Sequence, residues 1–386
     1  MRVSQFFCKN FRTLPNVNIT LRDFNVIVGP NGAGKSSLLQ VINLFGGASK
    51  EGRLSDFLAY YGGFHAAVSL FRITERMGFG LGLSEVGTEH SWTYSVDLTG
   101  TSGGGYLIEH ESFDHTDKPF GSLGSRIASF ERDSRGCMFY LGDRGSKGSI
   151  NTPSTELSIS SAPGFVPEAA KLIESLNRIA LWRSSSFLPD GRVRVPQQLR
   201  PVSSPASDGS DLYSALYNLR TTRKSAFSEL LENIRHAIPQ FEDVEFPVVG
   251  AGHVYMAWKQ RDLAREIDAG QLSDGTLRLL WLLTILAYAP QDGLILIDEP
   301  ELSLHPQWIQ LLVALLRKKS AKTTIVVATQ SAEFLRWLEP SELLIADLTE
   351  EGTKFFWADE HHDIKGWLED FSLSQLWTMG ELGGRR

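Results

Sequence analysis

The chain has 386 residues and 42% hydrophobic residues, enough to bury a large core without disulfides or structural metals. Its two cysteines, Cys8 and Cys137, form neither a disulfide framework nor a zinc spacing, and no signal-peptide core follows the first methionine, so a small secreted cystine-rich fold is excluded. The net charge of −7 excludes a basic protein that coats DNA, and residues 279–289 form too short an apolar run to cross a bilayer, so we expect a cytoplasmic protein without a membrane partner.

The N-terminal segment alternates and then becomes apolar, which predicts a hairpin that leads into one buried strand at residues 26–28. A glycine-rich turn follows, and residues 36–45 then have helical periodicity without a breaker. From residue 46 to about 165, glycine, serine and threonine are frequent and short stretches alternate, as at residues 92–98. We therefore expect residues 46–165 to form a mostly β insertion with antiparallel strands.

Helical patterning returns at residues 167–180, and two helices are expected on either side of a loop rich in proline and serine at residues 201–209. We expect residues 166–249 to form a helical subdomain. Within it, residues 178–224 contain eight basic and three acidic residues. This basic segment either contacts a nucleic-acid backbone or pairs with acidic side chains of the protein.

An apolar helix is expected at residues 276–288, followed by strand, helix and strand at residues 294–297, 306–316 and 324–328. Such βαβ alternation predicts an α/β fold with a parallel sheet covered on both faces. We assign residues 1–45 and 250–345 to one core, and residues 346–386 to an acidic tail that packs on it. The tail's tryptophans, Trp357, Trp367 and Trp377, are expected to be core anchors rather than a base-stacking platform.

Residues 29–36 match the phosphate-loop pattern G-x-x-x-x-G-K-[ST] at every fixed position, between a predicted strand and a predicted helix. The glycines let backbone N–H groups point at phosphate oxygens, and the helix N-terminus adds its positive end. Lys35 is expected to neutralise the β- and γ-phosphates and Ser36 to bind Mg²⁺. A chance match in a chain of this size is on the order of one in a hundred. We predict that ATP is bound by Gly29, Pro30, Asn31, Gly32, Ala33, Gly34, Lys35, Ser36 and Ser37.

The apolar strand at residues 294–297 ends in two adjacent carboxylates, Asp298 and Glu299. In α/β proteins the carboxyl ends of the strands are where ligands bind. Asp298 is expected in the Mg²⁺ shell, and Glu299 is expected to orient or deprotonate the attacking water. A strand end with two carboxylates also occurs without function, and the phosphate loop favours the catalytic interpretation.

Ser273, Asp274 and Gly275 precede the apolar helix, where serine and aspartate are favoured helix caps. The same helix start is also suited to a γ-phosphate contact. The chain resembles the ABC-type ATPase heads in three motifs: a phosphate loop, a late Ser-x-Gly helix start, and an Asp-Glu strand close behind it. Within these heads it resembles the RecF, SMC and OLD-like group. Residues 9–13 are similar to that group's N-terminal strand, and residues 299–306 to its extended Walker B and D-loop.

The resemblance implies a P-loop NTPase head with a mixed sheet and a homodimer or higher oligomer in which two ATP molecules lie between subunits. Each ATP would lie between the Lys35 loop of one subunit and Ser273, Asp274 and Gly275 of the other. Ser303 and His305 would then lie near the dimer seam, although His305 before Pro306 is equally well explained as a helix start.

Two features depart from the resembled group. Its switch histidine is replaced by Gln330, whose amide can hydrogen-bond a γ-phosphate but carries no proton at neutral pH. No glutamine lies between Gln40 and Gln197, so the glutamine that couples nucleotide to the inserted region is absent, and His65 is one candidate substitute. We therefore expect catalysis by Glu299, Lys35 and Gln330 to be slow or to depend on a partner.

OLD-type enzymes carry a nuclease domain after the ATPase head, whereas only 57 residues follow Thr329 here. We therefore expect any nuclease to be a separate effector chain, as in stand-alone ATPase components of bacterial anti-phage defence or toxin systems that the chain resembles. Two alternatives remain open: a RecF-like repair ATPase that binds DNA, and a switch that dimerises on ATP, barely hydrolyses it and restrains an effector.

Overall fold

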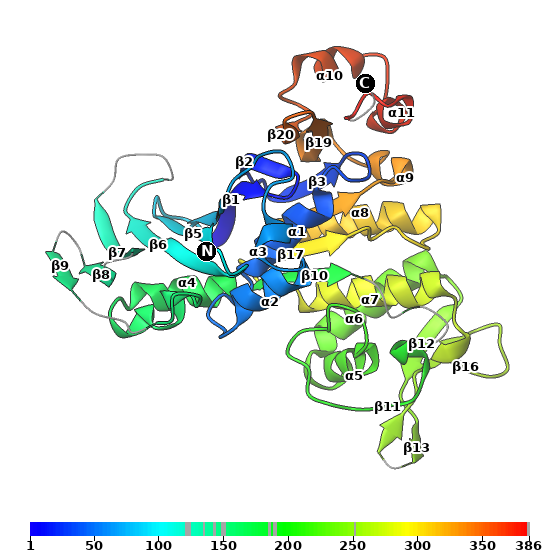
Figure 1. The fold of residues 1–386 in the computed structure, drawn as a ribbon. Helices are drawn as coiled ribbons and strands as arrows, with labels where there is room; N and C mark the ends of the chain where they lie inside the picture. The colour runs from blue at the N-terminus through cyan, green and yellow to red at the C-terminus, as the bar shows by residue number, and fades with distance from the viewer. Residues whose placement is uncertain are drawn as a thin grey trace.

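The computed structural model describes residues 1–119, 125–133, 136–141, 144–147, 152–183, 187, 191–250 and 252–383. Two large sheets dominate this part of the chain, and they lie side by side in Figure 1. A helical region lies below the core sheet in that view, and the C-terminal helices lie above it.

The core sheet has six strands in the order β10-β17-β18-β3-β19-β20, in which only β20 is antiparallel to its neighbour. Every residue of β3 and β18 is buried, which is typical of central parallel strands covered on both faces. The register places the carboxyl ends of these strands at one edge. The strands are β3 (Phe24–Val28), β10 (Ile179–Arg183), β17 (Leu294–Asp298), β18 (Thr324–Thr329), β19 (Leu343–Thr349) and β20 (Gly352–Trp357).

Alternate residues of the core strands enter two hydrophobic cores. Leu294 and Leu296 belong to the core that contains helix α1, whereas Ile295 and Ile297 belong to the core that contains α7 and α8. This division follows from the two-residue period of a strand. The helices are α1 (Lys35–Leu44), α7 (Asp274–Tyr288), α8 (Pro306–Ser320) and the short α9 (Ala332–Leu335).

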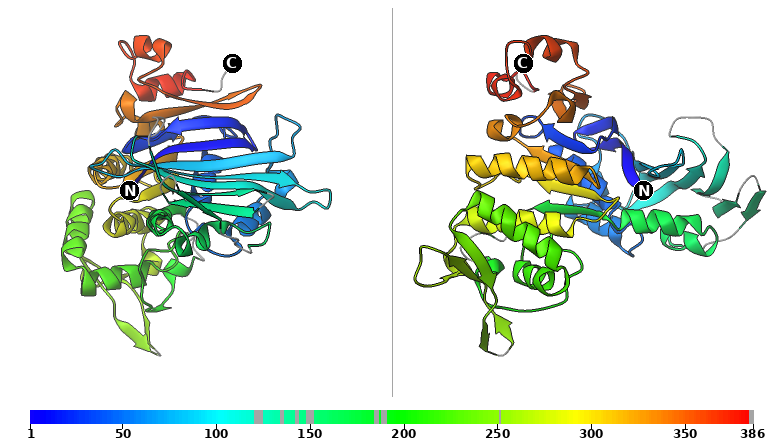
Figure 2. Two further views of the ribbon diagram at one scale, coloured as in Figure 1. Left: turned by 90° about the vertical axis from the view of Figure 1, so that its left-hand side faces the viewer. Right: turned by 180° about the vertical axis from the view of Figure 1, so that it is seen from behind.

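The second sheet is antiparallel, with eight strands in the order β2-β1-β4-β5-β6-β7-β8-β9, and is seen broadside in the left panel of Figure 2. One face packs into the α1 core, where Trp92, Tyr94 and Phe113 are fully buried. Its strands are β1 (Arg2–Phe11), β2 (Leu14–Thr20), β4 (Arg76–Ser84), β5 (Ser91–Gly100), β6 (Tyr106–Thr116), β7 (Arg126–Asp133), β8 (Gly136–Leu141) and β9 (Arg144–Lys147). The helices of this lobe are α2 (Arg53–Tyr60), α3 (Phe64–Ala67) and α4 (Glu168–Leu176).

The helical region is built on α5 (Leu212–Thr222) and α6 (Lys224–Ala237), which pack against α7 and carry two small sheets. These sheets contain β11 (Gln197–Gln198), β12 (Phe241–Glu245), β13 (Val248–Gly250), β14 (His253–Val254), β15 (Ala257–Gln260) and β16 (Ile267–Asp268). The tail ends in α10 (His362–Trp367) and α11 (Leu373–Met379). Short 3₁₀ turns lie at Ser158–Ser160, Ala162–Gly164, Arg192–Arg194, Ala269–Gln271 and Pro340–Glu342.

The mixed α/β architecture, with antiparallel N-terminal strands, is the one that we expected from the sequence. However, β10 comes from the segment expected to be helical, and β20 comes from the segment expected to be a tail on the core. Four apolar residues followed by Arg183 suit a helix or a strand equally, and parallel pairing with β17 decides the outcome. In the part of the chain that the structure describes, no helix combines the length and apolarity that a bilayer crossing requires.

Candidate active site

The phosphate loop joins β3 to α1 at the carboxyl edge of the core sheet. Gly34, the residue before α1, has a φ of 78°, in the left-handed region that favours glycine. A Cβ atom at Gly34 would lie 2.5 Å from Thr13 Oγ1, so the loop packs closely against the β1–β2 turn. Both observations explain why glycine is needed at this position.

Lys35 and Ser36 lie directly beside the carboxylate that ends β17. Lys35 Nζ donates hydrogen bonds to the carbonyl oxygens of Gly29 at 2.7 Å and Pro30 at 2.9 Å. Burial lowers the pKa of Lys35, and the carboxylates of Glu299 and Asp298 partly oppose this effect. Ser36 Oγ lies 3.3 Å from Asp298 Oδ1. The predicted phosphate-binding and metal-binding residues are therefore neighbours.

A cavity of about 190 Å³ opens over the phosphate loop and also includes Gln330 and the β1–β2 turn. Its lining residues are Arg12, Thr13, Asn31, Gly32, Gly34, Lys35, Ser36, Ser37 and Gln330. The buried hydroxyl of Thr13, which lines this cavity beside Gly34, has no hydrogen-bond partner among the described residues. An unsatisfied hydroxyl next to backbone N–H groups is suited to a phosphate-bearing ligand, so the residues present fit a nucleotide.

Mg²⁺ would depend on Ser36 and Asp298 together with phosphate oxygens. Among the described residues, no three His, Cys, Asp or Glu side chains cluster closely enough to hold a metal ion by themselves. A hydroxyl and a single carboxylate with substrate oxygens are the ligands that Mg²⁺ accepts in nucleotide sites.

Glu299 and Gln330 are in direct contact, because their parent strands β17 and β18 are neighbours. Gln330 Nε2 donates a hydrogen bond of 2.9 Å to Glu299 Oε1. Arg278 of α7 donates to the Glu299 carbonyl oxygen at 2.5 Å, and Glu299 itself has a φ of 49°. Such a φ is strained for a glutamate and occurs where surrounding contacts hold it, often at functional sites.

Glu301 is a further carboxylate in this loop, to which the sequence analysis gave no role. Its Oε1 accepts hydrogen bonds from Thr329 Oγ1 at 2.5 Å and from the backbone N–H of Gln330 at 3.4 Å. Burial raises the pKa of Glu301. Glu301 therefore anchors the end of β18 to the loop that carries Glu299.

Ser273 caps α7, with its hydroxyl accepting from the Thr276 amide at 3.1 Å. Asp274 forms an ion pair with Arg194, whose guanidinium also donates to the carbonyl oxygens of Gly270 at 3.0 Å and Leu272 at 2.8 Å. A Cβ atom on Gly275 would lie 2.3 Å from the Ser303 carbonyl oxygen. The predicted signature triplet is thus held by its own chain.

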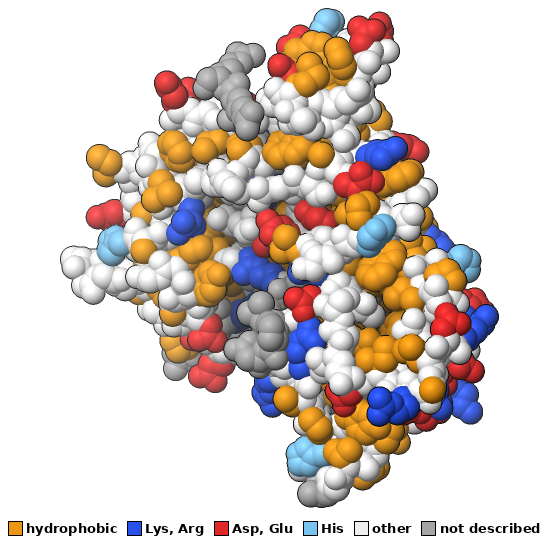
Figure 3. All heavy atoms as spheres, turned by 90° about the vertical axis from the view of Figure 1, so that its right-hand side faces the viewer, with side chains coloured by type: hydrophobic (Ala, Val, Ile, Leu, Met, Phe, Trp, Pro, Cys, Tyr) orange, Lys and Arg blue, Asp and Glu red, His pale blue; other side chains and the backbone are white. Residues whose placement is uncertain are grey.

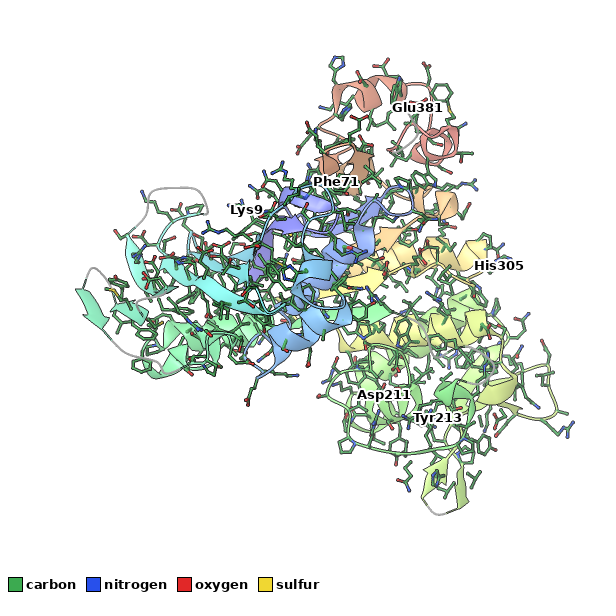
Figure 4. The ribbon with its side chains drawn as sticks, viewed as in Figure 1. Lys9, Phe71, Asp211, Tyr213, His305 and Glu381 are labelled. Atoms are coloured by element: carbon green, nitrogen blue, oxygen red, sulfur yellow. The ribbon has the colours of Figure 1, made fainter. Side chains whose placement is uncertain are left out.

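His305 caps α8 through Nδ1, which accepts from the Gln307 amide at 3.3 Å. The helix-start interpretation of His305 therefore accounts for its contacts. Figure 4 shows His305 at the right-hand end of α8, and Figure 3 looks onto that side of the molecule. Basic and acidic side chains gather near the middle of the face shown in Figure 3.

An arginine that was not singled out from the sequence lies beside Asp298 at the end of β10. Arg183 ends β10, and its Nε lies 3.4 Å from Asp298 Oδ2. The Gln40 amide lies against the guanidinium of Arg183 and the hydroxyl of Tyr61. His65 packs beside Phe64 and Gly100 and is not among the described residues that line the cavity over the phosphate loop.

Most of the basic segment at residues 178–224 is engaged inside the protein. Six of its eight basic side chains have a carboxylate, carbonyl or aromatic neighbour: Arg178, Arg183, Arg194, Arg200, Arg220 and Arg223. Most basic side chains of this segment therefore have a neighbour within the chain itself.

A family model described as "AAA domain, putative AbiEii toxin, Type IV TA system" matches residues 24–336. No curated protein matches the sequence. The structure resembles an SMC head bound to the C-winged helix domain of ScpA, with 11% identity, a TM-score of 0.54, and 92% of this chain and 97% of that chain covered. It also resembles the Smc head domain with an extended coiled coil, bound to the C-terminal domain of ScpA, from Pyrococcus furiosus. That comparison has 11% identity, a TM-score of 0.53, and coverage of 96% and 100%. The predicted fold of an ABC/SMC-like P-loop ATPase head is thereby confirmed.

Proposed function

Since the chain belongs to the AAA-domain family described as "putative AbiEii toxin, Type IV TA system", with an SMC-like ATPase fold, we propose that it binds ATP with Mg²⁺ and hydrolyses it to ADP and phosphate. One observation carries this proposal. Lys35, Ser36 and Asp298 meet at the carboxyl edge of the sheet, where Glu299 contacts Gln330.

Each of these residues has a distinct part in the proposed reaction. Backbone N–H groups of residues 29–37 cradle the phosphates, and Lys35 neutralises charge on them. Glu299 accepts the proton of the attacking water, and Gln330 holds the Glu299 carboxylate and senses the γ-phosphate. Ser36 and Asp298 would hold Mg²⁺, which when bound neutralises developing phosphate charge. Because Gln330 cannot carry a proton, we expect low basal turnover.

We further propose that ATP joins two heads, with Ser273, Asp274 and Gly275 of one subunit completing the site of the other. Ser273 caps α7, so the helix N-terminus is ordered and suited to an anionic phosphate. In this proposal residues 1–45 and 250–345 form the ATPase core, while β10 and β20 contribute the two edges of its sheet.

The family description supports a toxin-type role, and we propose that this head is the cytoplasmic ATPase component of a defence or toxin system with a separate nuclease-like effector. The RecF-like alternative, with DNA as partner, is less well supported because six of the eight basic residues at 178–224 have internal neighbours. Electrophoretic shift assays at low salt, with ATP and the Glu299→Gln variant, test that alternative. ATP-dependent duplex binding would restore it.

The deciding experiment is titration of the purified chain with ATP in the presence and absence of Mg²⁺, alongside phosphate release. Lys35→Ala is expected to abolish both signals, whereas Lys50→Ala, a change six residues beyond the end of α1, is expected to leave both unchanged. Absence of Mg²⁺-dependent ATP binding by the unmodified chain would overturn the proposal.

A further inference from the structure

The carbonyl oxygen of Gln330 is held by the C-terminal tail. Trp377 of α11 donates its indole Nε1–H to this oxygen at 3.0 Å. The side-chain amide of Gln330 donates a hydrogen bond to Glu299, and its backbone N–H donates one to Glu301. Three side chains therefore hold Gln330 through the hydrogen bonds described here. Glu299 and Glu301 belong to the loop after β17, whereas Trp377 belongs to the C-terminal helix α11.

The tail is packed firmly enough to act as such an anchor. Helix α11 begins with a capping box between Ser372 and Gln375 and ends at Gly380, whose φ is 86°. Leu373 and Leu376 are buried in the core that contains α7 and α8. Leu382, three residues after the helix, is fully buried as well. Figures 1 and 4 show α11 and Glu381 above α9, the helix that follows the switch residue.

A cavity of about 420 Å³ separates the tail from the phosphate loop. Pro30, Asn31 and Gln330 line one side, and Trp377 and Thr378 of the tail are among the residues on the other. Asn31 and Gln330 also line the cavity over the phosphate loop. Helix α11 thus borders the nucleotide site, and Trp377 is hydrogen-bonded to Gln330 there.

We propose that Trp377 is a positioning residue for Gln330, so that the tail sets the geometry of the γ-phosphate switch. The expected effect on turnover rests on the proposed ATPase function, whereas the expected effect on the order of Gln330 does not. An indole N–H bound to a backbone carbonyl restricts residue 330 without contributing a reacting group. Trp377 therefore acts through Gln330 and is not a catalytic residue.

Trp377→Phe keeps an aromatic ring and removes the N–H donor. Hydrogen exchange of the nucleotide-free protein is expected to show about fivefold faster exchange at residues 330–332, as loss of one hydrogen bond implies. Trp367→Phe is the matched control, because Trp367 is a partly exposed tail tryptophan on α10. It is expected to leave this exchange unchanged. Trp377→His restores a ring N–H and is expected to recover part of the protection.

Steady-state kinetics supply the second readout. Trp377→Phe is expected to lower kcat about fivefold while KM for ATP stays within about twofold. In a Gln330→Ala background the same change is expected to have no further effect, because the two residues act as one unit.

Unchanged exchange in Trp377→Phe, or a full additional loss in the Gln330→Ala background, would overturn the positioning role. If the unmodified protein fails to hydrolyse ATP, the proposed function fails. The exchange measurement still decides whether Trp377 orders Gln330.

Discussion

The core sheet and the antiparallel sheet both bury carboxylates, and they hold them in different ways. Glu111, in the middle of β6, is fully buried and accepts hydrogen bonds from Tyr94 Oη at 2.9 Å and from the amides of Ser158 at 2.7 Å and Ile159 at 3.0 Å. Arg132 Nη1 lies 3.6 Å away. This carboxylate ties two segments of the lobe together.

In the core sheet, Glu299 and Glu301 lie beyond the end of β17 rather than within a strand. Glu301 Oε2 is buried and has no hydrogen-bond partner in the part of the chain that the structure describes. Glu299 is held through Gln330 in a strained backbone conformation. A network whose groups are satisfied adds rigidity, whereas a partly satisfied loop keeps groups available to a ligand. Changes at Glu111 in the antiparallel sheet should therefore affect stability, and changes in the loop after β17 of the core sheet should affect turnover.

The largest expected effect is that of Glu299→Gln. Loss of the general base is expected to lower kcat about 10³-fold, while the midpoint of thermal unfolding and the Kd for ATP change little. Phosphate release and calorimetry measure these quantities. Glu360→Gln, at an exposed carboxylate paired with Arg22, is the control. Comparable loss in both variants would contradict the catalytic assignment of Glu299.

Glu111→Ala tests the other side of the comparison. It leaves the Tyr94 hydroxyl and the backbone amides of Ser158 and Ile159 without their acceptor, and it removes the carboxylate beside Arg132. This is expected to lower the free energy of unfolding by about 3 kcal/mol. Urea denaturation measures the loss, and the folded fraction should still bind ATP. Glu109→Ala, on the same strand as Glu111, removes an exposed ion pair with Arg76 of β4 and should cost less than about 1 kcal/mol. Equal losses of stability in Glu111→Ala and Glu109→Ala would show that the buried carboxylate contributes no more than the exposed one.

Gly275→Ala places a methyl group 2.3 Å from the Ser303 carbonyl oxygen. The resulting shift of α7 against the loop that holds Glu299 is expected to cost about 2 kcal/mol of stability and to lower turnover as well. Gly366→Ala is the control, since nothing lies within 4 Å of the added atom. Full stability and turnover in Gly275→Ala would show that this close approach is not required.

The antiparallel sheet also contains a pH-sensitive group. Burial beside Trp92, and then the neighbouring His90, lower the pKa of His115 from 6.5 to about 4. Between these values the unfolded chain binds more protons than the folded one, so stability is lost as the pH falls from 6.5 to 4. We expect a loss of roughly 1–2 kcal/mol that disappears in His115→Gln and persists in His362→Gln, an exposed control. Urea denaturation at several pH values measures it, and a pH-independent wild type would contradict this expectation.

The short contiguous motifs of this protein were readable from the sequence alone. The phosphate loop, the Asp298–Glu299 strand end and the Ser273 cap depend on local backbone geometry, on strand ends and on helix starts, which neighbouring residues determine. The alternation at residues 92–98 likewise indicated a half-buried strand, and these residues lie in β5.

Contacts between distant residues needed the tertiary structure. The strand order β10-β17-β18-β3 brings Arg183 to Asp298 and Gln330 to Glu299, and the docking of α11 brings Trp377 to Gln330. The sequence contains Arg183 and Trp377 but does not reveal their contacts. The partner of Arg183 depends on which strands pair, and the partner of Trp377 depends on where α11 packs. Those choices are decided by the burial of whole apolar faces, not by the residues next to them in the chain.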